Sequence, residues 1–123
     1  MKFRIAFMVL FVLSLGVWTW KLLESNPLPP VVKDLLSWSE WLMFALAKSL
    51  HAGAYAYCTV VGRLGFTDRR AKSGVAAFMV LHGIGTEIGQ TYIPNRHGSV
   101  RDVVIDSVGV LAGWAFAVRV LKA

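Results

Sequence analysis

The sequence contains little cysteine and comparatively little charge. Cys58 is the only cysteine, which excludes an internal disulfide and a thiolate metal cluster. Only 16% of the residues are charged and 56% are hydrophobic, whereas soluble domains carry about 25% charged residues. A soluble domain of 123 residues has too little interior to bury so many apolar side chains. We therefore expect lipid to solvate most of this chain.

The sequence also lacks several motifs that would indicate a particular enzymatic reaction. It has no nucleophile elbow, no phosphate-binding loop and no H-E-x-x-H metal motif. The net charge of +6 does not gather into one basic patch, which argues against nucleic acid as a partner. Instead, the basic residues lie between apolar runs, as they do in membrane proteins.

Four apolar runs predict membrane-spanning helices at about 5–23, 45–64, 74–93 and 102–121. A run of about 20 residues, at about 1.5 Å per residue, crosses a hydrocarbon core of ~30 Å. Lys2 and Arg4 precede the first run as they would in a signal peptide, but no small-residue cleavage site follows. We therefore interpret the first run as an uncleaved anchor, with Trp18 and Trp20 as interfacial anchors.

The segment between the first two runs combines prolines with charged residues and tryptophans. Pro27, Pro29 and Pro30 should end the first helix. The charged, Trp-rich stretch at about 31–42 predicts a short interfacial helix that bends or continues into the second span. The predicted fold is thus all-α: one integral membrane domain over 1–123, a four-helix bundle with an interfacial helix between spans one and two.

The basic residues also predict an orientation for these spans. Arg69, Arg70 and Lys72 cluster in the turn between the second and third spans. Because Lys and Arg are enriched on the cytoplasmic side, we expect this turn and both termini to be cytoplasmic, in the cytoplasmic (inner) membrane.

In such an up-down bundle, polar residues from three spans and one turn meet at the extracytoplasmic end. They are Lys48, His51, Glu87, Gln90, Arg96, Asp102 and Asp106. Lys48, His51 and Tyr55 lie at i, i+3 and i+7, on one helix face. Gly109 and Gly113 lie on the face of Asp106 and should let a neighbouring helix approach closely. Ionisable groups inside spans are costly and usually face partners or water, so the pattern predicts a shallow, hydrated site.

Structural roles compete with this functional interpretation. Asp102 and Arg101 would form an ion pair that pins the turn, and Lys48 would extend toward the headgroups. We interpret His82 as a neutral, buried histidine bonded to a neighbour. A His/Glu/Asp metal site from His51, Glu87 and Asp106 has no local sequence spacing behind it, and we predict neither a metal nor another cofactor.

The segments "KSLHAGAYAY" and "GIGTEIGQTYIPNRHGSVRDVVIDSVGVLAG" resemble the VanZ-like membrane proteins over residues 45–115. The matching positions are Lys48, His51, Tyr55, Glu87, Gln90, Arg96, Asp102, Gly109 and Gly113. Asp106 departs from the Asn that is common in the family, and Ala47 departs from its frequent acidic residue. The resemblance implies a small multi-span protein of the cell envelope, in a family named for low-level resistance to teicoplanin, a lipoglycopeptide.

Three functions fit these residues. The first is binding or modification of a lipid-linked cell-wall precursor, another envelope lipid or a lipoglycopeptide, with Lys48, Tyr55, Gln90, Arg96, Asp102 and Asp106 as ligand-binding residues. The second is a membrane-embedded hydrolase or transferase acting on lipid headgroups, with His51 and Glu87 as acid–base catalysts. The third is a structural or transport-assisting subunit. The sequence defines neither turnover nor oligomeric state.

Overall fold

A computed structural model describes residues 1–25 and 28–123, which form five helices and no strand. The helices are α1 (Lys2–Leu23), α2 (Pro30–Leu36), α3 (Glu40–Gly65), α4 (Arg69–Gln90) and α5 (Val100–Arg119). The all-α prediction is therefore confirmed for this part of the chain. The predicted break at Pro27 lies outside the described residues.

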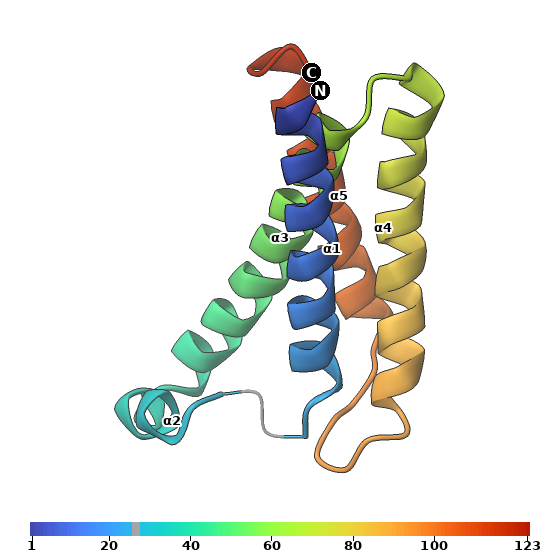
Figure 1. The fold of residues 1–123 in the computed structure, drawn as a ribbon. Helices are drawn as coiled ribbons and strands as arrows, with labels where there is room; N and C mark the ends of the chain where they lie inside the picture. The colour runs from blue at the N-terminus through green and yellow to red at the C-terminus, as the bar shows by residue number, and fades with distance from the viewer. Residues whose placement is uncertain (26–27) are drawn as a thin grey trace.

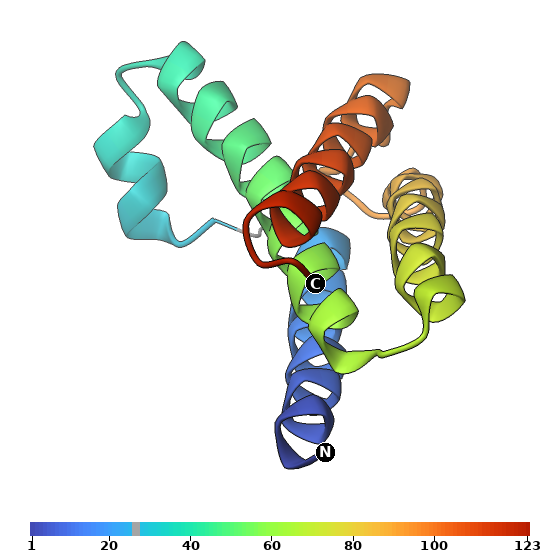
Figure 2. The same cartoon turned by 90° about the horizontal axis from the view of Figure 1, so that it is seen from above.

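The four long helices run alternately up and down, and both termini lie at the same end as the α3–α4 turn (Figure 1). The short helix α2 and the α4–α5 loop lie at the opposite end. Helix α3 contacts every other helix, and Figure 2 shows it crossing the molecule at an angle, with α2 displaced to one side. The arrangement places residues near the start of α3, the end of α4 and the start of α5 at one end of the molecule.

The expected interfacial helix at 31–42 is wrong in extent. Helix α2 ends at Leu36, and α3 begins at Glu40 and runs without interruption to Gly65. The reason is a local cap: the Ser39 hydroxyl accepts a hydrogen bond from the Leu42 N–H at 3.2 Å, and Glu40 places negative charge in the first turn. Pro30 ends no helix but is the first residue of α2, where its missing N–H costs nothing.

Helices α3 and α5 pack most extensively, because two glycines remove the side chains between their backbones. A Cβ atom at Gly109 would collide with the backbone of Ala52, and one at Gly113 with that of Ala56. The sequence-based expectation for these glycines is therefore confirmed. The hydrophobic core includes Leu22, Tyr55, Cys58, Val75, Met79 and Val110.

Helix α1 is the one described helix that is long and apolar enough, by length and composition, to cross a membrane. One such helix supports membrane association only weakly, because a signal sequence has the same properties. Helices α3, α4 and α5 are of similar length, but they carry the ionisable residues that lower hydropathy.

Candidate functional site

The α4–α5 loop is tied to helix α4 by the Glu87 carboxylate. Glu87 is 4% exposed, and its Oε2 accepts a hydrogen bond from the Ser99 N–H at 2.8 Å. The Ser99 hydroxyl in turn accepts from the Asp102 N–H at 3.1 Å and caps α5. These two bonds fix where α5 begins and therefore where its acidic residues lie.

Lys48 of α3 forms an ion pair with Asp102 of α5. The lysine side chain is 21% exposed and the aspartate 8% exposed, so this pair lies at the edge of the site. The alternative pairing of Asp102 with Arg101 is wrong, because the Arg101 guanidinium lies over the Phe44 ring, 4.9 Å from its centroid. Lys48 therefore binds a partner within the protein and does not extend away from it.

His51 of α3, Asp106 of α5 and Glu87 of α4 converge next to this ion pair. His51 and Asp106 lie about one helical turn after Lys48 and Asp102. His51 Nδ1 lies 3.1 Å from Asp106 Oδ1, and one ligand-type atom from each of the three residues lies within 4.8 Å of the others. We call these three residues the acidic triad. Asp106 is 1% exposed, so both carboxylates of the acidic triad are almost fully removed from solvent.

Each carboxylate of the acidic triad has one oxygen without a partner. Within residues 1–25 and 28–123, neither Glu87 Oε1 nor Asp106 Oδ2 has a hydrogen-bond donor in reach. Buried carboxylate oxygens normally accept hydrogen bonds, because leaving them bare forfeits their hydration without compensation. The acidic triad is therefore chemically incomplete within the described chain.

Arg96 and Gln90 both donate to one backbone carbonyl. The Leu22 C=O accepts from the Arg96 guanidinium at 2.7 Å and from the Gln90 amide at 3.0 Å. This carbonyl belongs to the last turn of α1, whose C=O groups have no partner within the helix. Burial lowers the pKa of Arg96, and the carboxylates of Glu87, Asp102 and Glu24 oppose that shift. The guanidinium stays charged, as it does in proteins generally.

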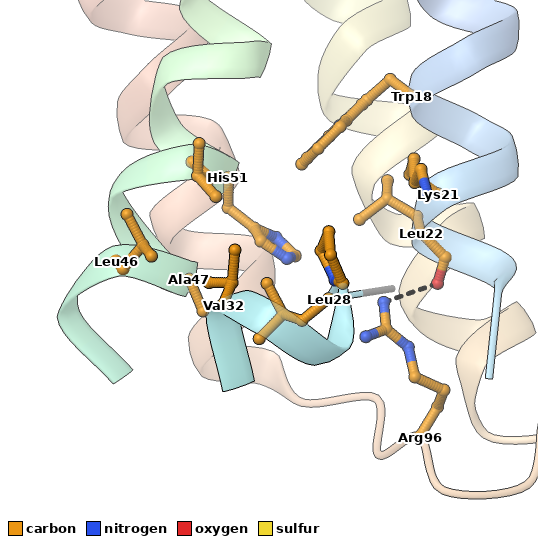
Figure 3. Close-up of a pocket in the computed structure, with 11 residues that line it drawn as sticks. Trp18, Lys21, Leu22, Leu28, Val32, Leu46, Ala47, His51 and Arg96 are labelled. Atoms are coloured by element: carbon orange, nitrogen blue, oxygen red, sulfur yellow. Dashed lines mark hydrogen bonds between the residues drawn. The ribbon is translucent and has the colours of Figure 1, made fainter. Parts of the chain in front are cut away.

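A cavity of about 380 Å³ opens beside Arg96 and His51. Figure 3 shows both side chains at its wall, with the dashed line marking the Arg96–Leu22 bond. The other lining residues come mainly from α1, α2 and α3 and are mostly apolar: Trp18, Lys21, Leu22, Leu28, Pro29, Val32, Leu46, Ala47 and Leu50. The cavity wall is thus mostly apolar but includes the cationic side chains of Lys21 and Arg96. We call this cavity the α1–α3 cavity.

Tyr55 does not line the α1–α3 cavity, although it shares a helix face with His51. It is fully buried, and its hydroxyl lies 3.0 Å from His82 Nδ1 and 3.3 Å from the Thr86 hydroxyl. His82 Nε2 lies 2.8 Å from the Thr19 hydroxyl, which itself donates to the Leu15 carbonyl. A neutral His82 with its proton on Nε2 donates to the Thr19 hydroxyl and accepts from the Tyr55 hydroxyl. The Thr86 hydroxyl donates to the Gly83 carbonyl at 3.0 Å. We call Thr19, Tyr55, His82 and Thr86 the hydroxyl–histidine network.

Trp18 is a site residue, although its sequence context predicts an interfacial anchor. It does not serve only as an interfacial anchor: its ring packs edge-on against His51, with centroids 5.5 Å apart, and it lines the α1–α3 cavity. The overlooked signal was the helical spacing of Phe11, Leu15, Trp18 and Leu22, which form the face of α1 that packs on the core.

The site is therefore a buried polar cluster at one end of an all-helical protein, beside an apolar cavity that carries cationic groups. The family model VanZ/LLP1 matches residues 4–122. The chain thus belongs to the VanZ/LLP1 family, as the motifs around Lys48 and Glu87 suggested. Searches of curated proteins and of solved structures gave no match to this chain.

Proposed function

We propose that this protein is a four-span membrane protein that binds an amphipathic, anionic envelope component in the α1–α3 cavity. Lipid-linked cell-wall precursors and lipoglycopeptides both belong to this chemical class. Arg96 binds the anionic group, and the wall formed by α1, α2 and α3 receives the apolar chain. In this proposal the cavity end is extracytoplasmic and both termini are cytoplasmic.

The distribution of apolar side chains supports four spans. Apolar residues on the outward faces of α4 and α5 recur at helical spacing and are exposed: Leu81, Ile84, Ile88, Val104, Val108 and Leu111. The ionisable residues of the same helices, such as Glu87 and Asp106, are buried between helices. A lipid-exposed bundle needs apolar residues outside and paired polar residues inside. Hydropathy averaged over a whole helix combines the exposed apolar face with the buried polar face, so it does not reveal this separation.

The observation that carries the proposed ligand is the composition of the α1–α3 cavity wall. A cavity of about 380 Å³ is of the size that takes a small ligand or one end of a larger one. Arg96 Nε has no acceptor among the described residues, so the guanidinium has donor capacity left for an anion. Arginine binds phosphate and carboxylate through two parallel N–H donors.

Binding of a brominated lipid tests this assignment directly. The purified protein in neutral detergent is titrated with short-chain phosphatidylglycerol carrying brominated acyl chains, and quenching of tryptophan fluorescence is measured. We expect saturable quenching that Trp18→Phe reduces, because Trp18 lines the α1–α3 cavity. Arg96→Gln should weaken binding by about tenfold or more, the usual value of hydrogen bonds to a charged group.

The matched control for charge is Arg101→Gln. Arg101 lies at the same end of the molecule but outside the cavity lining, so its variant should bind like the wild type. Phosphatidylcholine with the same acyl chains should bind more weakly than phosphatidylglycerol. Equal affinities of the Arg96 and Arg101 variants would refute a specific role for Arg96.

A cellular measurement addresses the lipoglycopeptide branch of the proposal. Expression of the wild type should lower susceptibility to teicoplanin, and Arg96→Gln at equal membrane abundance should not. An effect that both proteins share would show that resistance does not pass through the cavity.

A second candidate function, acid–base catalysis on the bound headgroup, is favoured by the His51–Asp106 contact. If His51 Nδ1–H donates to Asp106, the ring presents Nε2 as a proton acceptor, the arrangement of a general base oriented by a carboxylate. His51→Gln should then abolish release of headgroup products while leaving quenching by the brominated lipid intact. Turnover that survives His51→Gln would exclude this mechanism.

A further inference from the structure

We propose that the acidic triad is a binding site for a divalent transition-metal cation. His51 Nδ1, one Glu87 oxygen and one Asp106 oxygen are the ligands. This site is distinct from the anion site at Arg96 and does not depend on the proposed lipid ligand.

The geometry of the acidic triad is close to that of a metal site. One ligand-type atom from each of the three residues lies within 4.8 Å of the others. Metal bonds of about 2.0–2.2 Å to nitrogen and oxygen bring any two ligands of one ion within about 4.4 Å. Metal binding would draw the Glu87 and Asp106 side chains together by this difference. The separation of 3.1 Å between His51 Nδ1 and Asp106 Oδ1 already suits two ligands of one ion.

The unpartnered oxygens are an independent reason to place a cation here. Glu87 Oε1 and Asp106 Oδ2 lack donors within the described chain, and both residues are less than a tenth exposed. The described lysines and arginines form no ion pair with either carboxylate, since Lys48 is bound to Asp102 and Lys21 to Glu24. A divalent cation would supply both the missing charge and the missing partner for these oxygens.

The surrounding helices leave room for this arrangement. Gly83 lies one turn before Glu87 on α4, and a Cβ atom there would come within 3.3 Å of Asp106 Oδ2. A glycine at this position therefore lets α5 bring its carboxylate beside α4. Without it, the two acidic residues would be held further apart.

The ligand set indicates the class of metal. One imidazole with two carboxylates suits Zn²⁺ or Mn²⁺, whereas Mg²⁺ and Ca²⁺ are bound by oxygen ligands. Three protein ligands leave a coordination position for water, the arrangement found in catalytic metal sites. His51 forms part of the wall of the α1–α3 cavity, so that position lies beside the proposed ligand site.

The metal site and the general-base mechanism require different tautomers of His51. Metal binding through Nδ1 places the ring proton on Nε2, whereas the hydrogen bond to Asp106 places it on Nδ1. The two interpretations therefore make different predictions for the same side chain, and metal binding alone separates them.

The test is metal binding by the full chain, purified in neutral detergent through an affinity tag that contains no histidine. The protein is stripped with EDTA and titrated with Zn²⁺, Mn²⁺ or Mg²⁺ alone. Stoichiometry is measured by elemental analysis after gel filtration, and affinity by calorimetry. We expect one equivalent of Zn²⁺ or Mn²⁺, with Mg²⁺ at least about tenfold weaker.

Isosteric variants identify the ligands without changing the packing. Glu87→Gln and Asp106→Asn should each lower affinity by at least about tenfold, since loss of even an outer-shell partner costs that much. Asp34→Asn is the control for loss of a carboxylate, because Asp34 is exposed on α2 and lies outside the triad. His97→Ala controls for surface binding, because His97 is an exposed loop residue. Both controls should retain wild-type affinity.

Three outcomes would overturn the proposal. They are failure of the stripped wild type to bind Zn²⁺ or Mn²⁺, equal affinity of wild type, Glu87→Gln and Asp106→Asn, and loss of binding in His97→Ala alone. Gel filtration of each variant establishes that it is folded. Arg96→Gln should bind metal normally, so failure of the lipid-binding proposal and failure of this one are distinguishable.

Discussion

The hydroxyl–histidine network and the acidic triad lie about one helical turn apart, yet they use their hydrogen-bonding capacity differently. In the network, His82 has a partner at each ring nitrogen, and Tyr55 lies between two neighbours. In the acidic triad, two buried carboxylates each keep an oxygen without a donor among the described residues. A satisfied network rigidifies a core, whereas an unsatisfied group costs stability and calls for another explanation, such as a ligand. The comparison favours a structural role for the network and supports the proposed ligand-binding role of the acidic triad.

The two sets also differ in the helices that supply them. The hydroxyl–histidine network uses α1, α3 and α4, whereas the acidic triad uses α3, α4 and α5. Changes confined to α5 should therefore disturb the acidic triad and spare the network.

The largest effect is expected for Gly113→Ala. The added methyl group meets the Ala56 backbone, which cannot move aside as a flexible side chain could, so we expect about 3 kcal/mol of destabilisation. Metal binding by the acidic triad should weaken as α5 moves away. Unfolding by denaturant in detergent, followed by tryptophan fluorescence, measures the first effect. Gly85→Ala is the control, because its Cβ would meet open space.

Breaking the Lys48–Asp102 ion pair should have the next largest effect. Lys48→Met leaves a buried carboxylate unpaired, and because the lysine is partly exposed we expect a loss of about 2 kcal/mol, between the values for surface and buried pairs. The double variant Lys48→Met/Asp102→Asn should recover most of this loss. A double variant no more stable than Lys48→Met would contradict the pairing.

Tyr55→Phe tests the hydroxyl–histidine network. It removes the donor to His82 Nδ1 and leaves that nitrogen unsatisfied, so we expect a loss of about 1–2 kcal/mol with unchanged metal affinity. Tyr57→Phe is the matched control, because the Tyr57 hydroxyl forms an exposed hydrogen bond with Ser14, at 3.3 Å. Similar losses of stability in both variants would show that the buried network stabilises the fold no more than an exposed hydrogen bond does.

Asp106→Asn should change stability least and function most. The amide keeps the shape of the carboxylate and removes a buried charge, so without metal we expect stability to stay within about 1 kcal/mol of the wild type or to rise. Metal binding should fall at the same time. A large loss of stability in the metal-free variant would mean that Asp106 belongs to the folding core, and the contrast between the two polar sets would fail.

Much of this site could be predicted because helical spacing converts sequence directly into faces. Bringing His51, Glu87 and Asp106 together from three helices required only an up-down order of those helices. Their pairing could not be predicted in the same way. Whether Asp102 binds Lys48 or Arg101 depends on the rotation of α5 against α3, which is set by Gly109 and Gly113 meeting Ala52 and Ala56.

The role of backbone groups was also beyond sequence reasoning. Arg96 and Gln90 were expected to face a ligand, but their shared acceptor is the Leu22 carbonyl, and every residue has such a carbonyl. The boundary between α2 and α3 was missed for a related reason. A single serine hydroxyl at Ser39 decides it, against a run of residues that would otherwise favour one continuous helix.

The double occupancy of the Leu22 carbonyl gives Arg96 a freedom that a lone donor would lack. If the guanidinium swings toward an anion in the α1–α3 cavity, Gln90 still holds the end of α1. Ligand binding then breaks the Arg96–Leu22 hydrogen bond, but the Leu22 carbonyl keeps the hydrogen bond from Gln90. Without Gln90, Arg96 should therefore stay bonded to the Leu22 carbonyl and exchange more slowly to a bound anion.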